Sequence, residues 1–482
     1  MLRKRAARVA LATLPCALLL SACAVGPAYH QPASPKATLA VPASADGAQR
    51  FVPGAEVSGD WWTLFHSPQL DALIAQALAH NPDLKAAQAA LRVANENALA
   101  QRGAFLPSVS VSLAASRQRQ AGTLAPVPNS NTFEYNLFTP QLSVSYAPDV
   151  FGATRRGAES LAAQTQAARF QMIAVWNTLA SNVAVTAIQL ASLNAQIDAT
   201  QHVIDAGTQM LDITQLRLRK GYASGADVAA QETQLAQLKA GLPPLRKQQA
   251  QTRDALAMLT GHFPSPSSAP SVTLNALQLP ENLPVSLPSA LVAQRPDVRQ
   301  AEANLHAASA QVGIATAARL PSLTLSADTG STALAFSKLF TAGTGFWDFG
   351  TSLVAPVFQG GTLLHQQRAA KAAYAEAAAQ YRSTVLGAFQ NVADALAALD
   401  ADAGAVMATT RAEQAAERSR NLAQRQQRDG YADNLALLNA EQAWQQTRIA
   451  SIQARANRLA DTAALYQALG GGWWHHPDLA KP

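Results

Sequence analysis

The sequence predicts a fold of mixed α and β structure, mainly α, in which one structural unit occurs twice. Three observations predict it: a heptad pattern in a very long helical stretch, four segments that alternate between apolar and polar residues, and an internal repeat. The composition agrees, because only 14% of the 482 residues are charged and alanine, the best helix former, is abundant in the helical stretches.

The heptad pattern lies in a proline-free stretch from Arg155 to Arg219. Apolar residues recur at every seventh position, with a second row between them, which is typical of a helix that faces a partner helix along one stripe. The rows are Trp176, Val183, Leu190, Ile197, Ile204, Leu211 and Leu218, and Leu179, Thr186 and Leu193. About 65 residues at about 1.5 Å each make a rod of about 100 Å. Because globular helices rarely exceed about 25 residues, the pattern favours a coiled-coil rod over an ordinary long bundle helix.

Residues 1–22 are predicted to be a lipoprotein signal peptide. A basic start and an apolar run precede Leu20-Ser21-Ala22-Cys23, which resembles a bacterial lipobox. In that pattern the cysteine becomes the new N-terminus and carries covalent lipid. Ala24 follows, so nothing resembles an inner-membrane retention signal. The alternative is an ordinary secretory peptide with a chance cysteine.

Charge and hydropathy exclude several classes of protein. The net charge is +6, but four basic residues belong to the leader, which leaves about +2 for the mature chain and no argument for nucleic-acid binding. No run of 18 apolar residues follows the leader, so no transmembrane helix is expected. Cys16 lies in the leader, so Cys23 has no partner for an intramolecular disulfide.

The rest of the chain divides by composition and by the repeat. Trp61, Trp62 and Phe65 are expected to be packing anchors. The expected regions are a lipidated extended N-terminal segment at 23–68, a first repeat at 69–261, a Pro- and Ser-rich linker at 262–290, a second repeat at 291–469 and a C-terminal tail at 470–482.

Each repeat is expected to contain two strands that are apolar on one face and polar on the other. In the first of them, Val109 and Val111 alternate with Ser110 and Ser112. This two-residue period is typical of a strand with one apolar face and one face in water. The four strands are expected at about 106–118, 137–147, 320–328 and 346–357.

Helices are expected on both sides of these strands. One should run from Gln69 to Ala104, where Phe105-Leu106-Pro107 ends it. A second helix should follow the rod from about Gly225, interrupted and kinked at Pro243-Pro244, and stop near Gly261.

The second half of the chain repeats this order. Asn81-Pro82-Asp83-Leu84 corresponds to Arg295-Pro296-Asp297-Val298, and Arg219-Lys220-Gly221-Tyr222-Ala223 corresponds to Arg428-Asp429-Gly430-Tyr431-Ala432. A second rod is expected at about 365–427, with a last helix at 435–469. Each half is therefore predicted to contain helix, strand, strand, long helix and helix.

Four strands with one apolar and one polar face cannot close a membrane barrel, which needs about eight or more strands. An unpaired sheet edge cannot lie in hydrocarbon either, because its N–H and C=O groups have no partner there. The strands are therefore expected to pair with those of other copies. Two copies would make eight strands with a filled lumen, and three would make twelve strands that can enclose water. The rods would then form a ring of helices on one side of the barrel.

Six segments match motifs of a known family. They are Cys23-Ala24-Val25-Gly26-Pro27, Trp61-Trp62-Thr63-Leu64-Phe65, Asn81-Pro82-Asp83-Leu84, Arg295-Pro296-Asp297-Val298-Arg299-Gln300-Ala301-Glu302, Ala318-Arg319-Leu320-Pro321-Ser322 and Leu353-Val354-Ala355-Pro356-Val357-Phe358-Gln359-Gly360-Gly361. With these motifs the whole chain resembles the outer-membrane factor family, which contains TolC-like and OprM-like proteins, and specifically its NodT-type lipoprotein branch.

The resemblance implies a homotrimer with a twelve-stranded transmembrane β-barrel, four strands per chain, continuous with a long coiled-coil helical tube in the periplasm. It implies docking to a periplasmic adaptor protein and an inner-membrane pump, RND-type and proton-driven. The channel would be a passive exit duct for drugs, metals or other small toxic compounds, lipid-anchored in the outer membrane. The alternative within transport is the outer-membrane duct of a protein-secreting type I system. No cofactor is implied apart from the covalent lipid on Cys23.

The resemblance also implies a periplasmic gate, a ring of acidic residues shortly after the glycine of each helix-hairpin turn. These turns are expected at Gly221 and Gly430. In the last helix the two usual acidic positions are Ala436 and Asn439, which is a departure from the family. The corresponding position of the first half, Asp227, is retained.

Charge for the gate could come from neighbouring residues. Asp429 and Asp433 lie close in sequence to the second turn, and Asp227 with Arg428 is a candidate pair for holding the tube closed. A carboxylate ring on a three-fold axis attracts cations. The alternative for Asp227 is a helix cap after Ser224-Gly225, and the two roles are compatible.

The sequence fits two other classes of function less well. A structural or adhesive trimeric coiled-coil lipoprotein explains the heptads and the lipid but not the four strands or the duplication. An enzyme is not expected, because the sequence has no metal-spaced His/Cys cluster, no glycine-rich phosphate loop and no paired carboxylates in a plausible pocket. His475-His476 is not expected to bind metal, since two adjacent histidines rarely complete a coordination shell.

Overall fold

The computed structural model describes residues 24–33, 48–119, 121, 134–264, 272–286, 288–429, 431 and 434–480. The chain forms two compact units, each made of segments from both halves of the sequence. The first unit contains residues up to Gln31, Leu91–Ala167 and Ala301–Tyr381. The second contains Pro32–Ala90, Ala168–Gln300 and Arg382–Pro482.

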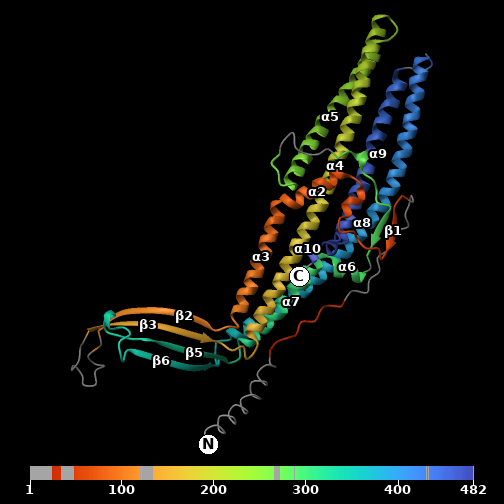
Figure 1. Ribbon diagram of the computed structural model, residues 1–482. Coiled ribbons are helices and arrows are strands. Elements are labelled where there is room, and N and C mark those ends of the chain that lie inside the picture. Colours follow the sequence, from red (N-terminus) through yellow and green to blue (C-terminus); the bar gives the residue numbers. More distant parts are fainter. Residues whose placement is uncertain are drawn as a thin grey trace. The chain divides into compact units, whose positions relative to one another are not determined.

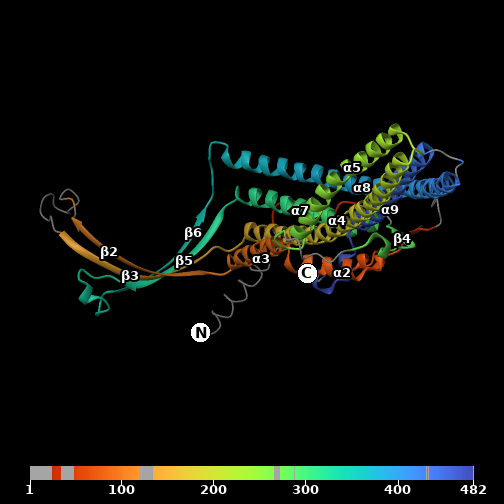
Figure 2. The ribbon, with the colours of Figure 1, turned by 90° about the horizontal axis from the view of Figure 1, so that it is seen from above.

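The first unit contains a four-stranded antiparallel sheet with the order β2-β3-β5-β6 (Figures 1 and 2). The strands are β2 (Ser108–Arg119), β3 (Glu134–Tyr146), β5 (Ser322–Ser331) and β6 (Gly345–Val354). Within the residues described here, β2 and β6 each pair on one side alone. The sheet therefore has two open edges, as the strand count predicts.

Helices flank each strand pair in the same order in both halves. The bounds are α3 (Pro82–Gly103), α4 (Ala153–Arg219) and α5 (Gly225–Leu259) in the first half, and α7 (Pro296–Ala317), α8 (Thr362–Arg428) and α9 (Asn434–Ala468) in the second. The two long helices α4 and α8 each contain 67 residues, and α5 and α9 each contain 35. The predicted duplication is therefore present in the structure, element for element.

The heptad rows of α4 are buried at one end and exposed at the other. Trp176, Val183 and Leu193 are buried, whereas Leu218, in the last turn, is 40% exposed. Around Ile204 the seam packs against α5 and α9, in a cluster of Val203, Ile204, Leu235, Leu238, Leu242 and Trp444. One 18-residue window of α4 is apolar enough to span a membrane, but 56% of it is buried, as in the core helix of a soluble domain.

The predicted helix from Gln69 to Ala104 is instead two helices, α2 (Pro68–His80) and α3. They are separated at Asn81, because a residue before proline is disfavoured in helical conformation and Pro82 cannot donate a backbone hydrogen bond. The side-chain oxygen of Asn81 accepts from the backbone N–H groups of Asp83 and Leu84 at 2.9 and 3.1 Å. Asn81 therefore caps α3.

The predicted interruption at Pro243-Pro244 is wrong, because α5 runs through both prolines. The prolines deprive the carbonyls of Lys239 and Ala240 of their usual donors. All four of these residues are exposed, so water can satisfy the freed carbonyl groups.

Trp61, Trp62 and Phe65 are buried, which confirms their prediction as packing anchors. They lie in a short 3₁₀ helix, η1 (Trp61–Phe65), and the Trp61 ring stacks on Tyr466 at 5.3 Å. Two further elements were not predicted. Strands β1 (Arg50–Pro53) and β4 (Asn282–Val285) form a parallel pair that joins the N-terminal segment to the linker between the repeats.

Candidate functional site

The four-stranded sheet has one continuous apolar face. Cross-strand pairing places Val109 opposite Val144, Ala327 opposite Phe349 and Leu323 opposite Leu353. Several of these side chains are open to solvent in the single chain, including Val111 at 80% and Trp347 at 80%. Apolar side chains that are exposed on β2, β3 and β6 and half-buried on β5 suit a hydrocarbon environment.

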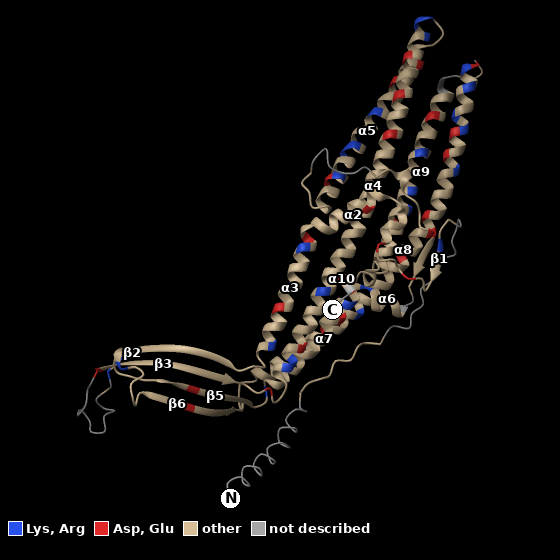
Figure 3. Ribbon diagram, viewed as in Figure 1, with Lys and Arg blue, Asp and Glu red and all other residues tan. Residues whose placement is uncertain are grey.

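The opposite face of the sheet is polar. Ser110 pairs with Ser143, Thr324 with Ser352, and Asp328 with Asp348. Figure 3 shows these two acidic positions on β5 and β6, on strands that otherwise carry little charge. The Gln141 Nε2 atom donates to Asp328 Oδ1 at 2.7 Å, which fixes one of the carboxylates. The polar face is therefore chemically suited to line water.

The N-terminal segment is held against the strand-to-helix junction of the first unit. The Val25 N–H donates to the Phe151 carbonyl at 3.1 Å, and Arg156 Nε donates to the Val25 carbonyl at 3.3 Å. A Cβ on Gly152, which has φ +84, would lie 2.8 Å from Ala24 Cα. The backbones of Ala24 and Gly152 therefore approach each other too closely for a residue with a Cβ atom at position 152. Cys23 itself lies outside the described residues.

Further along, this segment contacts α7. The Tyr29 ring stacks on His306 with centroids 4.2 Å apart and planes 14° apart. His306 Nε2 lies 2.9 Å from Glu159 Oε1, and Arg156 Nη1 donates to Glu159 Oε2 at 2.7 Å. Burial by itself would raise the pKa of Glu159, but the hydrogen bonds and charges of His306 and Arg156 together lower it below its ordinary value. Sequence analysis did not identify this cluster, because its members come from distant segments.

The first hairpin turn ends α4 at Gly221, which adopts φ +77. The Tyr222 N–H donates to the Arg217 carbonyl at 2.8 Å, the bond that closes a helix with a left-handed glycine. In the second hairpin the Tyr431 N–H donates to the Gln426 carbonyl at 2.8 Å, the equivalent bond of the repeat. Gly430 and Asp433 lie outside the described residues.

Asp227 caps helix α5. Its carboxylate accepts from the Ser224 N–H and the Ser224 hydroxyl, both at 2.8 Å, and the Asp227 N–H donates to Ser224 Oγ at 3.2 Å. These bonds form a capping box. The hydrogen bond from the Ser224 backbone is the main reason that the pKa of Asp227 is lowered. The structure therefore shows the capping role, which leaves the gating role as a proposal.

The other predicted gate residues lie apart from Asp227 within one chain. Arg428 is exposed at the end of α8, and Ala436 and Asn439 are exposed in the first turns of α9. Among the residues that the structure places, no ion pair joins Asp227 to Arg428. A pair between them would have to join two copies of the chain.

One acidic residue of this region was missed in the sequence. Glu441 follows Asn439 by two positions on α9 and is half-buried. Burial raises the pKa of Glu441, and the neighbouring Arg420 opposes that shift. The departure at Ala436 and Asn439 was the signal that could have led to it, because Glu441 lies within one helical turn of Asn439 and within two turns of Ala436.

The two tail histidines contact acidic residues of the N-terminal segment. His475 Nε2 lies 3.4 Å from Glu56 Oε2, and His476 Nε2 lies 3.6 Å from Asp60 Oδ1. Across the described ranges, no group of three or more His, Cys, Asp or Glu side chains could hold a metal ion. The His476 ring also packs against Trp176, with ring centroids 4.8 Å apart.

Comparison with known proteins identifies the same architecture. A family model described as outer membrane efflux protein matches residues 73–262 and 287–471, one match in each half of the chain. The chain is 33% identical over 474 residues to the pyoverdine export outer membrane protein OpmQ of Pseudomonas putida, covering 96% of this chain and 97% of that protein. It is 30% identical over 471 residues to the toluene efflux pump outer membrane protein TtgC of Pseudomonas putida, covering 96% of each.

Solved structures agree with the sequence relatives. The outer-membrane channel OprN superimposes with a TM-score of 0.85 at 26% identity, covering 94% of this chain and 100% of that one. The chain therefore shares its fold with a solved outer-membrane channel. The chain belongs to the outer membrane efflux protein family and is a protein of the outer membrane.

Proposed function

We propose that three copies of this chain form the exit duct of a tripartite efflux system. The observation that carries the proposal is the four-stranded sheet with one continuous apolar face, one polar face and two open edges. In hydrocarbon both edges must pair, and pairing with equivalent edges of two more copies gives twelve strands around a polar lumen. The α4–α5 and α8–α9 hairpins would form the periplasmic tube that meets an adaptor protein and a pump.

Small molecules are the proposed cargo. Relatives across nearly the whole chain are named for the export of pyoverdine, toluene and antibiotics. The polar face of the sheet has serine, threonine and glutamine side chains with two aspartates, which offers hydrogen bonds without a specific pocket. Such a lining suits a passive duct whose selectivity lies in the pump.

We also propose that Cys23 carries the lipid anchor. Ala24, the next residue, lies against Gly152 between the end of β3 and the start of α4. Because consecutive Cα atoms are about 3.8 Å apart, acyl chains on Cys23 would enter the membrane beside the periplasmic ends of the strands. The N-terminal segment would thereby set the depth of the barrel in the bilayer.

Asp227 is proposed to act at the periplasmic entrance as well as in the α5 cap. It lies at the hairpin tip, where three copies would place three carboxylates around the axis. Like any aspartate with a pKa at or below the ordinary value, it is ionised at neutral pH, and a ring of carboxylates favours cations.

Deletion of the gene should cause exported compounds to accumulate inside the cells. A panel of toxic organic compounds, metals and the cell's own siderophore would be measured in the deletion strain, with complementation by the wild-type gene as the control. Accumulation of a small molecule, restored by complementation, is the expected result. Retention of a secreted protein in its place would indicate the type I alternative, and no accumulation of any kind would contradict the export proposal.

Replacement of Cys23 by serine should abolish incorporation of radiolabelled palmitate, because serine offers no thioether. Cys16→Ser is the matched control, since Cys16 lies in the leader and should leave labelling unchanged. Equal labelling of the Cys23→Ser protein would refute the anchor assignment.

Asp227→Ala should raise single-channel conductance and reduce cation selectivity in planar bilayers, because it removes the proposed charge ring. Ser224→Ala is the control: it removes the other half of the same cap, at a similar cost of about 1 kcal/mol, and keeps the carboxylate. If both variants behave alike, or Asp227→Ala conducts like the wild type, Asp227 is a cap alone.

A further inference from the structure

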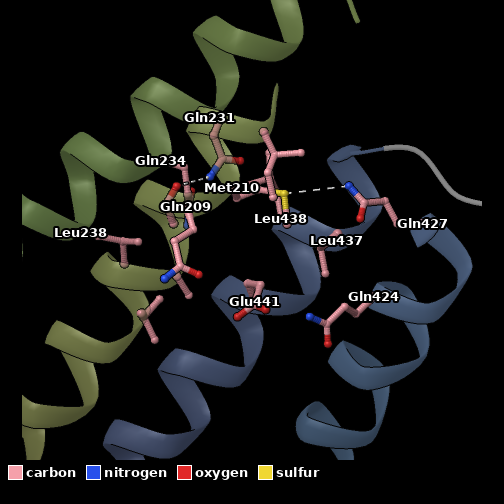
Figure 4. Close-up of a pocket in the computed structure, with 14 residues that line it drawn as sticks. Gln209, Met210, Gln231, Gln234, Leu238, Gln424, Gln427, Leu437, Leu438 and Glu441 are labelled. Carbon is pink, nitrogen blue, oxygen red and sulfur yellow. Dashed lines mark hydrogen bonds between the residues drawn. The ribbon is translucent and has the colours of Figure 1, made fainter. Parts of the chain in front are cut away.

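A cavity of about 200 Å³ lies between the two helical hairpins of the second unit (Figure 4). Its walls come from α4, α5, α8 and α9, so both halves of the duplicated chain contribute to it. It is somewhat larger than an apolar cavity of about 150 Å³ that holds benzene. The size therefore suits a molecule with one ring or a short alkyl chain.

Most of the cavity wall is apolar. Met210 from α4, Leu238 from α5 and Leu437 from α9 contribute hydrocarbon or thioether surface. Figure 4 shows these side chains around one space, with Glu441 of α9 among them. The arrangement combines a hydrophobic lining with one charged group, as in many small-molecule sites.

Two of the glutamines that line the cavity contact a neighbouring helix. Gln231 Nε2 donates to the Gly207 carbonyl at 3.2 Å, and Gln427 Nε2 lies 3.9 Å from Met210 Sδ. Both contacts are drawn in Figure 4. Because these contacts join α5 to α4 and α8 to α4, the walls are preformed rather than dependent on a ligand.

Glu441 lacks a matched counter-charge. Within the described part of the chain it forms no ion pair with a basic side chain. Arg420, whose charge acts on Glu441, makes its own contacts elsewhere: its guanidinium lies 3.9 Å from the Trp444 ring centroid, and its Nη2 donates to Asn421 Oδ1 at 3.0 Å. Burial raises the pKa of Glu441, with Arg420 opposing, as expected for a partly desolvated carboxylate.

We propose that this cavity binds a small organic cation with an apolar body, its ammonium group at Glu441 and its hydrocarbon against Met210, Leu238 and Leu437. An anion would be repelled by the carboxylate. A neutral ligand would bury Glu441 further without pairing it, which costs free energy. A metal ion is disfavoured because a single carboxylate does not make a coordination shell.

Binding of such a cation would connect the two hairpins of one chain. Its proposed contacts lie on α4, α5 and α9, and α8 also lines the cavity, so it would stabilise the folded arrangement in which these helices surround it. The site is independent of the export proposal, because it depends on the fold of one chain and not on what passes through the channel.

Binding can be tested with three probes of similar shape and different charge. Benzylammonium, benzyl alcohol and benzoate would be titrated into the purified full-length protein and followed by ligand-observed saturation-transfer NMR. We expect saturable binding of benzylammonium, at least about tenfold tighter than benzyl alcohol, since a charge-assisted hydrogen bond is involved. Benzoate should show no saturable binding. Equal affinity for benzylammonium and benzyl alcohol would overturn the proposal.

Variants then locate the site. Glu441→Gln keeps the shape of the side chain and should remove the tenfold preference for the cation. Glu232→Gln is the matched control, because Glu232 is an exposed glutamate on α5 that does not line the cavity. Glu441→Asp retains the charge and should bind with intermediate affinity. If the Glu441→Gln protein is folded, as checked by circular dichroism, and still prefers benzylammonium over benzyl alcohol tenfold, the proposed site is refuted. If that variant does not fold, the comparison of the three probes on the wild-type protein decides.

Discussion

Unpaired backbone groups at the two edges of the β2-β3-β5-β6 sheet are the constraint on which the structure depends. Inside hydrocarbon each N–H and C=O group needs a protein partner, and four strands are too few to close on themselves. The chain belongs to an outer-membrane family, and in the proposed assembly β2 and β6 pair with strands of other copies. The continuous apolar face, which would be an aggregation hazard in water, is then the lipid-facing wall of the assembly.

The two halves of the duplicated chain close their helical hairpins in the same way but place acidic residues at different positions. Both hairpins close with the same backbone bond, from Tyr222 to Arg217 and from Tyr431 to Gln426. Their charges are used differently. In the first hairpin the carboxylate of Asp227 is at the tip and caps α5, whereas in the second the exposed positions Ala436 and Asn439 are uncharged and the carboxylate of Glu441 faces a cavity. The two hairpins therefore share this closing bond and differ in where the first turns of α5 and α9 place an acidic residue.

Periodicity predicted most of the fold, because it reports which faces are buried or wet. The heptads of α4 and the alternation around Val109 and Val111 located the rod and the strands, and comparison of the halves located their repeats. The features that the sequence did not predict are contacts between segments that lie far apart in the chain. The β1–β4 pair, the stack of Tyr29 on His306 and the cavity at Glu441 each join residues whose proximity no local pattern encodes. The wrong prediction of a helix break at Pro243-Pro244 had a different cause. Proline usually interrupts a helix, but here the carbonyl groups that lose their hydrogen-bond donors are exposed and can bind water.

The most direct test of the account is a recording of single channels from the purified protein in planar bilayers, for the wild type and for Ser110→Lys. If copies of the sheet close around a polar lumen that contains Asp328 and Asp348, the wild type gives discrete, cation-selective conductance steps. Ser110→Lys, on the polar face, then lowers that selectivity without loss of folded protein, whereas lysine at Val111 on the lipid face should cost about 2–4 kcal/mol of stability. Wild-type protein that inserts but gives no conductance steps, or a selectivity unaffected by Ser110→Lys, would contradict the account.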